Sequence, residues 1–465
     1  MRFALALLLA WLGAGAAAAQ PPRLVEVAVT HDGARWTADF AFRARSRAWL
    51  LLRSPVARIG EQPWRPRSWT IETPGVRLER RGHWDVLTTS DGRPVPANVR
   101  IRFTPFSGDV LGDYDPALVF TDGSVALYSG QFTATPIGSA ATAARLPGDL
   151  NEANLPETRT RIVFRDSAGP VMLAGRRQPA ATVEGSDDGT YVLFGPIRPI
   201  VSESMAAVID PQLPAWIRTS LGRSVPDILG RYAAALGPAP GPKPMVMVSW
   251  AGPTPGMTSM GGSVLDGLIV MAYEGSGVLE ENARSRGSGL WFIAHESAHF
   301  WLGQAVHYDT ARQSWITEGG ADLLAIRTVA EVDPTYDWRG ELQKEVDDCA
   351  ALSAGRGIAS ALERNEYRAY YACGAVFALI AEAASRRPFT QFVRRLIETN
   401  RADRTVTRAE WLAALDQVSR DPSLSRDIGR MLDRGAAEPG AAIASLFTRA
   451  GVRFTPGPNG VPRLQ

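Results

Sequence analysis

The stretch that decides the fold is WFIAHESAHFW, residues 291–301, in which two histidines stand four residues apart in an otherwise apolar segment. The chain holds only five histidines in 465 residues, so the pairing of His295 and His299 needs an explanation. On a helix, residues i and i+4 share a face, which brings the two imidazoles close enough to bind one cation. The order His-Glu-x-x-His is typical of a zinc site whose glutamate, here Glu296, acts as a general base.

A third ligand follows at Glu318, in the stretch WITEGGADLLA, with eighteen residues between it and His299. That interval leaves room for one helix to end and for a second helix to bring Glu318 to the metal. Asp322 lies four residues further, on the same helical face. We expect it to accept a hydrogen bond from the second nitrogen of a ligand histidine, and a solvated carboxylate is the alternative. Three protein ligands and one open position for water predict one Zn²⁺ per chain.

The stretches HESAHFWLG (295–303) and WITEGGA (315–321) resemble the gluzincin metallopeptidases, in particular the aminopeptidase N family. The glycyl aminopeptidase family is similar in the same motifs. The resemblance implies a multidomain α+β fold with an N-terminal antiparallel β domain, a thermolysin-like catalytic domain and C-terminal helices. It also implies a peptide substrate, hydrolysed by water that the metal and Glu296 activate.

The resemblance assigns an oxyanion-stabilising residue as well. In the family, a tyrosine three residues before a glycine donates a hydrogen bond to the negative charge that develops in the transition state. Tyr371 stands three residues before Gly374 in YRAYYACGAVFAL, residues 367–379. Tyr370 is the adjacent competitor for this role, and a tyrosine of the core is the alternative reading of Tyr371.

One part of the cleft departs from the family, which has Gly-x-Met-Glu-Asn on a strand beside the metal. The matching stretch, MGGSVLDGLIVM (260–271), keeps Gly261 and Gly262 as expected substrate-binding residues, although a tight turn would also explain them. Val264 stands where the family's glutamate binds the free amino group of the substrate, and a valine cannot pair with an ammonium. The acids that lie near enough in the sequence to replace that glutamate are Glu274, Glu280 and Glu281.

Three functional alternatives therefore stay open. The chain is an aminopeptidase if another acid replaces the missing glutamate, or an endopeptidase of short peptides if none does. A zinc-containing peptide-binding protein that has lost catalysis is the third alternative. The presence of Glu296 argues against this last one, because a purely structural zinc needs no base and is usually closed by four protein ligands.

The pattern along the chain predicts several parts. Alternating apolar residues and Asp-Gly turns, such as Asp32–Gly33, recur from about residue 23 to 200 and indicate antiparallel strands. After about residue 205, helical spacing dominates, with a strand expected at 245–250 and either another strand or a hairpin through Asp266–Gly267 expected at 262–273. We expect a signal peptide (1–19), an N-terminal β domain (20–204), a thermolysin-like zinc catalytic domain (205–385) and a C-terminal helical region (386–465).

The first residues are typical of a secretory signal: Arg2, an apolar run and the small-residue stretch AGAAAAQ, with cleavage expected after Ala19. The apolar run is too short for a stable membrane span, and no later segment is long enough. We expect an exported mature chain, periplasmic or secreted, with an uncleaved anchor as the alternative. In an oxidising compartment, the only two cysteines, Cys349 and Cys373, often form a disulfide, and two buried thiols are the alternative.

The charge composition excludes one class of partner. The formal net charge is +2, and the basic residues form no cluster along the chain. Nucleic-acid binding, which depends on a basic patch or stripe, therefore has no support in the sequence.

Overall fold

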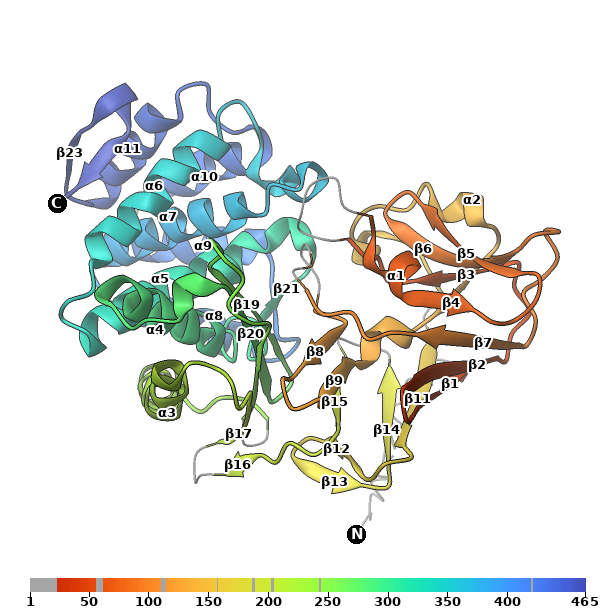
Figure 1. Cartoon of the computed structure of the whole chain (residues 1–465). Coiled ribbons are helices and arrows are strands. Elements are labelled where there is room, and N and C mark those ends of the chain that lie inside the picture. Colours follow the sequence, from red (N-terminus) through yellow and green to blue (C-terminus); the bar gives the residue numbers. More distant parts are fainter. Residues whose placement is uncertain are drawn as a thin grey trace, which may run out of the picture.

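The computed structural model describes residues 23–465 except 56–61, 109, 111–113, 157, 186–188, 202–204, 242–243 and 420. The expected signal peptide, residues 1–19, lies outside the described residues. Two lobes stand side by side, a β-rich lobe coloured red to yellow and a largely helical lobe coloured green to blue (Figure 1). Sheets precede helices along the chain, which confirms the predicted α+β class with its β-rich N-terminal part.

Three sheets build the β-rich lobe. The six-stranded sheet has the order β14 (Ala180–Gly185), β11 (Arg159–Asp166), β1 (Arg23–Asp32), β2 (Arg35–Phe42), β7 (Asn98–Phe103), β4 (Trp69–Ile71). The four-stranded sheet has the order β10 (Thr135–Ile137), β3 (Ala48–Leu51), β6 (Trp84–Thr89), β5 (Val76–Arg81). The five-stranded sheet has the order β13 (Arg176–Gln178), β12 (Val171–Leu173), β15 (Tyr191–Phe194), β9 (Val125–Tyr128), β8 (Ala117–Val119). Two short helices, α1 (Trp64–Ser68) and α2 (Ala140–Ala143), accompany these sheets.

Among the described residues of this lobe, the strands pair antiparallel except at one place. β1 and β2 form the predicted hairpin through Asp32–Gly33, in which Gly33 has the positive φ of 59° that favours glycine. β1 also pairs with β11, and that pair is parallel, with Val27 opposite Ile162. A parallel pair needs a long connection, and here most of the lobe lies between the two strands.

A fourth sheet supports the helical lobe. Its order is β16 (Ile200–Val201), β17 (Ala206–Ile209), β18 (Met245–Trp250), β20 (Leu268–Glu274), β19 (Ser259–Leu265). β17, β18 and β20 run parallel, while the edge strand β19 runs antiparallel to β20. β19 and β20 are the two arms of a hairpin through Asp266–Gly267, the second of the two forms that the sequence allows for this stretch.

This sheet lies between the two lobes, and the alternation of side chains along β18 shows how. Val246 and Val248 point into the core that the helices form. Met245 and Met247 point the other way and pack with residues of β8, β9, β12 and β15. Burial on both faces explains why MVMVSW reads as a continuous apolar run.

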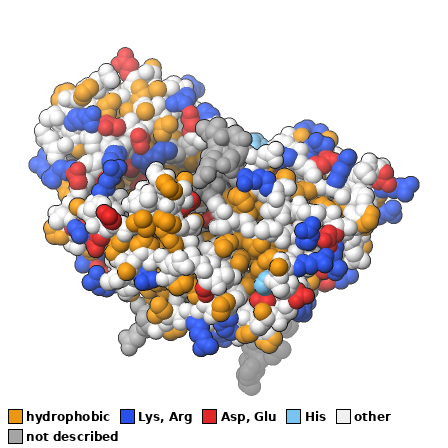
Figure 2. Space-filling view, viewed as in Figure 1, with side chains coloured by type: hydrophobic (Ala, Val, Ile, Leu, Met, Phe, Trp, Pro, Cys, Tyr) orange, Lys and Arg blue, Asp and Glu red, His pale blue; other side chains and the backbone are white. Residues whose placement is uncertain are grey.

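Helices make up most of the second lobe: α3 (Ala215–Leu236), α4 (Ala283–Ala298), α5 (Trp315–Val332), α6 (Trp338–Leu352), α7 (Arg368–Ser385), α8 (Phe389–Thr399), α9 (Arg408–Ser419), α10 (Pro422–Arg434), α11 (Pro439–Ala450). Two small strand pairs complete it, β21 (His307–Tyr308) with β22 (Thr405–Val406) and β23 (Phe454–Pro456) with β24 (Pro462–Leu464). In the described part of the chain, none of these helices combines the length and apolar character that crossing a membrane requires. On the face in Figure 2, acidic and basic side chains are interspersed over both lobes.

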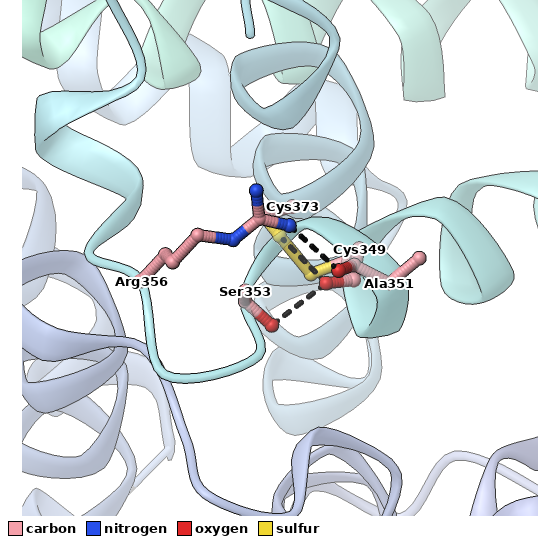
Figure 3. Close-up of a disulfide and its surroundings, with 5 residues drawn as sticks. All are labelled: Cys349, Ala351, Ser353, Arg356 and Cys373. Carbon is pink, nitrogen blue, oxygen red and sulfur yellow. Dashed lines mark hydrogen bonds between the residues drawn. A yellow bond between two sulfur atoms is a disulfide. The ribbon is translucent and has the colours of Figure 1, made fainter. Parts of the chain in front are cut away.

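The two cysteines form a disulfide that joins α6 to α7, which confirms the predicted bond (Figure 3). Cys349 lies in the last turns of α6, and Cys373 lies two residues after Tyr371 on α7. Beside it, the Ser353 hydroxyl donates to the carbonyl of Cys349 at 2.7 Å and Arg356 donates to the carbonyl of Ala351 at 3.1 Å. The disulfide therefore anchors the helix that carries the expected oxyanion-stabilising residue.

Candidate metal centre

The end of α4 and the start of α5 bring the predicted ligands together. His295 and Glu296 lie in the last turn of α4, and His299 is the residue that caps it. Glu318 lies in the first turn of α5. Apolar neighbours such as Phe292 bury this end of α4 in the helical core, which forces the polar side chains toward a common point.

The three ligand atoms have the spacing that a tetrahedral zinc ion needs. His295 Nε2 and His299 Nε2 are 3.1 Å apart, and each lies 3.4 Å from Glu318 Oε2. Zinc bonds of about 2.0–2.1 Å in tetrahedral geometry place neighbouring ligand atoms roughly 3.3 Å apart. A metal site needs three or more acids, histidines or cysteines whose ligand atoms lie close together. Among the described residues, His295, His299 and Glu318 form such a group, with all ligand atoms within 4.8 Å of one another.

The hydrogen bonds of the two imidazoles fix where their lone pairs point. His299 Nδ1 lies 2.8 Å from the carbonyl oxygen of Leu302, which can only accept, so Nδ1 carries the proton. His295 Nδ1 lies 2.9 Å from Asp322 Oδ1 and donates to that carboxylate in the same way. Each ring, once Nε2 has lost its proton to make way for a metal, therefore presents the Nε2 lone pair on the side of Glu318 Oε2. Three acceptors at this distance repel one another unless a cation lies between them, so the donor set fits Zn²⁺.

Electrostatics within the site favour the ionised ligand. Burial alone would raise the pKa of Glu318. With no ion between the three groups, burial lowers the pKa of both histidines, but Glu318 and, for His295, Asp322 raise it above its usual value. The protonated rings in turn hold the pKa of Glu318 well below the usual range. Burial raises the pKa of Glu296, and the two histidines offset only part of this rise. The site thus contains one carboxylate suited to binding metal and one whose affinity for a proton is enhanced.

Glu296 lies against the edge strand β19. A Cβ added to Gly262 would lie 2.7 Å from Cδ of Glu296 and 2.8 Å from Cζ of Phe292. Glycine at this position is therefore required for the Glu296 carboxylate to occupy its place. Gly261 is its neighbour on the same strand and lies opposite Ala272 of β20. The expected contact of these glycines with a substrate remains a prediction.

Two glycines set the distance between Glu318 and Tyr371. A Cβ on Gly319 would lie 2.1 Å from the carbonyl carbon of Gly374, and a Cβ on Gly374 would lie 2.2 Å from the carbonyl oxygen of Trp315. The backbones of α5 and α7 therefore touch directly at this crossing. This contact gives a physical reason for the glycine directly after Glu318 and for the glycine three residues after Tyr371.

Tyr371 lies beside the metal ligands. Its ring stacks on that of His295 with centroids 5.7 Å apart and planes 19° from parallel. Burial, together with the nearby Glu318 and Glu296 carboxylates, raises its pKa well above the usual value, so the phenol keeps its proton. Tyr370 points elsewhere, because its hydroxyl bonds with the backbone of Leu362 and Ala359. The structure thus favours Tyr371 over Tyr370.

None of the three acids considered as replacements for the family's amine-binding glutamate lies beside the zinc ligands. Glu274 pairs with Ser259, three residues and roughly 10 Å along β19 from Gly262, and accepts a hydrogen bond from Thr254 at 2.6 Å. Glu280 and Glu281 precede α4 and stand roughly 20 Å along the helix axis from His295. Val264 is partly buried against the helical core.

Sequence reasoning missed two parts of the site. The acceptor for His299 is the backbone carbonyl of Leu302, which no side-chain pattern reveals. Asp322 accepts from His295 as expected and is wholly buried, but Arg368, 3.7 Å from its second oxygen, was not predicted. The sole signal for this arginine was its place three residues before Tyr371, which by itself predicts nothing.

Comparison with solved structures addresses the fold. A two-domain M1 zinc metallopeptidase bound to L-arginine aligns over 90% of this chain and 95% of its own, with a TM-score of 0.50 and 16% identity. An M1 zinc metallopeptidase from Deinococcus radiodurans, bound to a Tyr-Ser-Ala substrate, aligns over 90% and 96%, with a TM-score of 0.50 and 15% identity. Leukotriene A4 hydrolase from Saccharomyces cerevisiae aligns over 90% of this chain and 68% of its own, with a TM-score of 0.52 and 12% identity.

No family model and no curated protein matches this chain in sequence. At identities this low, structural likeness speaks for the fold alone. The fold is that of the M1 zinc metallopeptidases, which confirms the resemblance that the motifs of residues 295–303 and 315–321 imply.

Proposed function

We propose that this chain is a zinc-dependent metallopeptidase in which His295, His299 and Glu318 bind one Zn²⁺. The observation that carries the proposal is the convergence of two imidazole lone pairs and one carboxylate oxygen at 3.1–3.4 Å from one another. The M1 metallopeptidase fold supports it. So does the buried carboxylate of Glu296 on the same helical turn, which a purely structural zinc would not require.

Residues of this chain supply the proton transfers. When bound, the zinc ion polarises the scissile carbonyl and lowers the pKa of a water molecule. Glu296, whose pKa burial raises, takes up a proton from that water and delivers it to the leaving nitrogen. The Tyr371 phenol keeps its proton and donates a hydrogen bond to the oxyanion.

The substrate backbone is proposed to bind along the edge strand β19. β19 ends the fourth sheet in the described part of the chain and packs against α4, with Gly262 next to Glu296. An extended peptide can add to such an edge through backbone hydrogen bonds, which are independent of its side chains. Gly261 and Gly262 allow its backbone to approach closely.

The class of peptidase depends on how the substrate's amino end is bound. Val264 offers no charge, and Glu274, Glu280 and Glu281 lie away from the zinc ligands. This observation favours an endopeptidase of short peptides as the second candidate beside an aminopeptidase. A peptide-binding protein without catalysis is the third.

We also propose that the mature chain is exported, to the periplasm or the medium. The leader expected at residues 1–19 and the Cys349–Cys373 disulfide support export, because disulfides persist in oxidising compartments. N-terminal sequencing of the protein from its native host tests this, and a mature chain that begins at Gln20 is expected. A chain that retains Met1 in the cytoplasm would contradict it.

Hydrolysis of matched short peptides tests the proposed activity. Zinc-loaded protein is given one set of peptides with free amino ends and one acetylated set, with Glu296→Gln as the blank. Cleavage of the free-ended set alone identifies an aminopeptidase, and cleavage of both sets identifies an endopeptidase. No cleavage above the blank across a broad panel would contradict the peptidase and favour the binding protein or a non-peptide substrate.

A further inference from the structure

A cluster of ion pairs extends from the buried Asp322, beside the metal centre, to the partly exposed Arg368 and on to α6. Asp322 is wholly buried, and its Oδ1 accepts from His295 at 2.9 Å. Its second oxygen, Oδ2, has no hydrogen-bond partner among the described residues, and Arg368 Nη1 lies 3.7 Å from it. A carboxylate removed from water is strongly destabilised unless an opposite charge compensates it. Arg368 is placed to provide that charge.

Two acids of α6 fix the orientation of Arg368. Its Nη2 donates to Glu345 Oε1 at 2.7 Å, and its Nε donates to Asp348 Oδ2 at 2.8 Å. A guanidinium is planar, so contacts at two of its nitrogens determine where the third points. The third, Nη1, points to Asp322. The disulfide between Cys349 and Cys373 joins α6 to α7 one residue after Asp348 (Figure 3).

We propose that Arg368 is a positioning residue for the zinc centre: it faces the buried Asp322 carboxylate, holds it against His295, and so sets how tightly the ligands bind the metal. The inference rests on the proposed function, because it takes His295, His299 and Glu318 to be zinc ligands. Arg368 acts through Asp322 and His295. Groups that orient a ligand histidine change metal affinity by about 10- to 100-fold when they are removed.

The chain offers a matched control in Arg327. This arginine of α5 pairs with Glu382 of α7, with Nη2 to Oε1 at 2.5 Å. The pair joins α5 to α7, as the contact between Asp322 and Arg368 does. Its side chain is 32% exposed, compared with 40% for Arg368, so the two ion pairs are similarly solvated. Glu382 lies eleven residues beyond Tyr371, roughly 16 Å along the helix. Arg327 lies five residues after Asp322, roughly 7.5 Å along α5, and the pair that it forms is with Glu382. Arg327→Met therefore removes an ion pair between α5 and α7 that does not include Asp322.

The test is the zinc dissociation constant of the full chain, measured by chelator competition, together with thermal unfolding of the metal-free protein. Arg368→Met is expected to weaken zinc binding about tenfold or more. Arg327→Met is expected to lower thermal stability to a similar extent while zinc affinity stays at the wild-type value. Arg368→Lys keeps the charge without the planar donors and should lie between wild type and Arg368→Met.

Two outcomes would overturn the inference. One is an unchanged dissociation constant in Arg368→Met, and the other is an equal loss of affinity in Arg327→Met, which would make the role merely structural. If Arg368→Met does not fold, Arg368→Lys decides, and wild-type affinity in that variant contradicts the inference. A wild-type chain that binds no zinc at all contradicts the proposed function instead, so the two failures are distinguishable.

Discussion

At the scale of single residues, the site is defined by which atoms carry protons. The carbonyl of Leu302 and the carboxylate of Asp322 each accept from the Nδ1 of a histidine, so the Nε2 lone pairs of both rings face Glu318. The two acceptors, the Leu302 carbonyl and the Asp322 carboxylate, orient the two histidines so that both can bind one metal ion. His-Glu-x-x-His without such acceptors would leave the ring orientations free.

Gly262 gives a sharp test of this arrangement. In Gly262→Ala, the new Cβ would lie 2.7 Å from Cδ of Glu296, so the carboxylate must move. Because Glu296 is the proposed base, we expect kcat to fall by about 100-fold, within the range for loss of a general base. Steady-state kinetics on a cleavable peptide measures this. Gly289 lies on α4, the helix that carries Glu296. In Gly289→Ala the new Cβ meets only ordinary contacts, the nearest at 3.8 Å, so this variant should retain full activity. Equal rates for both variants would contradict the placement of Glu296.

Glu345 predicts a pH dependence of stability. Its burial and the nearby Asp322 raise its pKa above the usual value, although Arg368 counteracts part of this rise. Between the ordinary pKa of an unfolded glutamate and the raised folded pKa, the folded chain binds more protons than the unfolded chain. Stability is therefore lost as the pH rises through this window. Glu345→Gln should lack this loss, as thermal unfolding at a series of pH values would show. Parallel profiles for the two proteins would refute it.

At the scale of elements, the crossing of α5 and α7 determines the distance between Glu318 and Tyr371. In Gly374→Ala, the Cβ would meet the backbone oxygen of Trp315 at 2.2 Å, and backbone cannot move aside as a flexible side chain can. We expect a loss of about 3 kcal/mol in the free energy of unfolding, at the upper end for an overpacked core, together with lower activity. Urea unfolding measures the loss.

Gly222→Ala is the control for the crossing. Gly222 lies within α3, and nothing stands within 4 Å of an added Cβ. Alanine also forms helix better than glycine, so this variant should be as stable as wild type or up to about 1 kcal/mol more stable. If both variants lose the same stability, the close contact of the helices is not the cause.

The disulfide contributes at the same scale. Cys349 and Cys373 are 24 residues apart and join α6 to α7. Cross-linking a loop of this length restricts the unfolded chain and stabilises a protein by about 3 kcal/mol in the loop-entropy account. The double variant Cys349→Ala/Cys373→Ala should therefore unfold at a lower denaturant concentration, followed by circular dichroism. An unchanged midpoint would show that the helices hold together without the bond.

At the scale of the whole molecule, the sequence predicts some features and not others for physical reasons. The pairing of His295 with His299 was predictable because helical geometry fixes which side chains share a face. Glu318 was predicted from its interval of eighteen residues, which leaves room for a second helix to bring it to the same point. The β19–β20 hairpin was predictable as one of two forms, since Asp266–Gly267 favours a tight turn. Local rules of this kind are contained in a few consecutive residues.

Features that depend on distant segments were not predictable. The parallel pairing of β1 with β11 brings residues 27 and 162 together, and no local pattern specifies that partner. Arg368 reaches Asp322 only because α5, α6 and α7 pack as they do. Strand β18 of the fourth sheet is buried on both faces only because the helices cover one face and the β-rich lobe covers the other. In each case tertiary packing, rather than propensity, determines the contact.

Everything proposed for this chain depends on the three converging ligand atoms making it a zinc-dependent peptidase. The most direct test is a titration of metal-free protein with Zn²⁺ while hydrolysis of a free-ended peptide from the panel is followed. We expect the rate to rise linearly and to stop rising at one equivalent of zinc per chain, and we expect Glu318→Gln to show no such break. A rate that is independent of added zinc, or absent at every ratio across the panel, would contradict it.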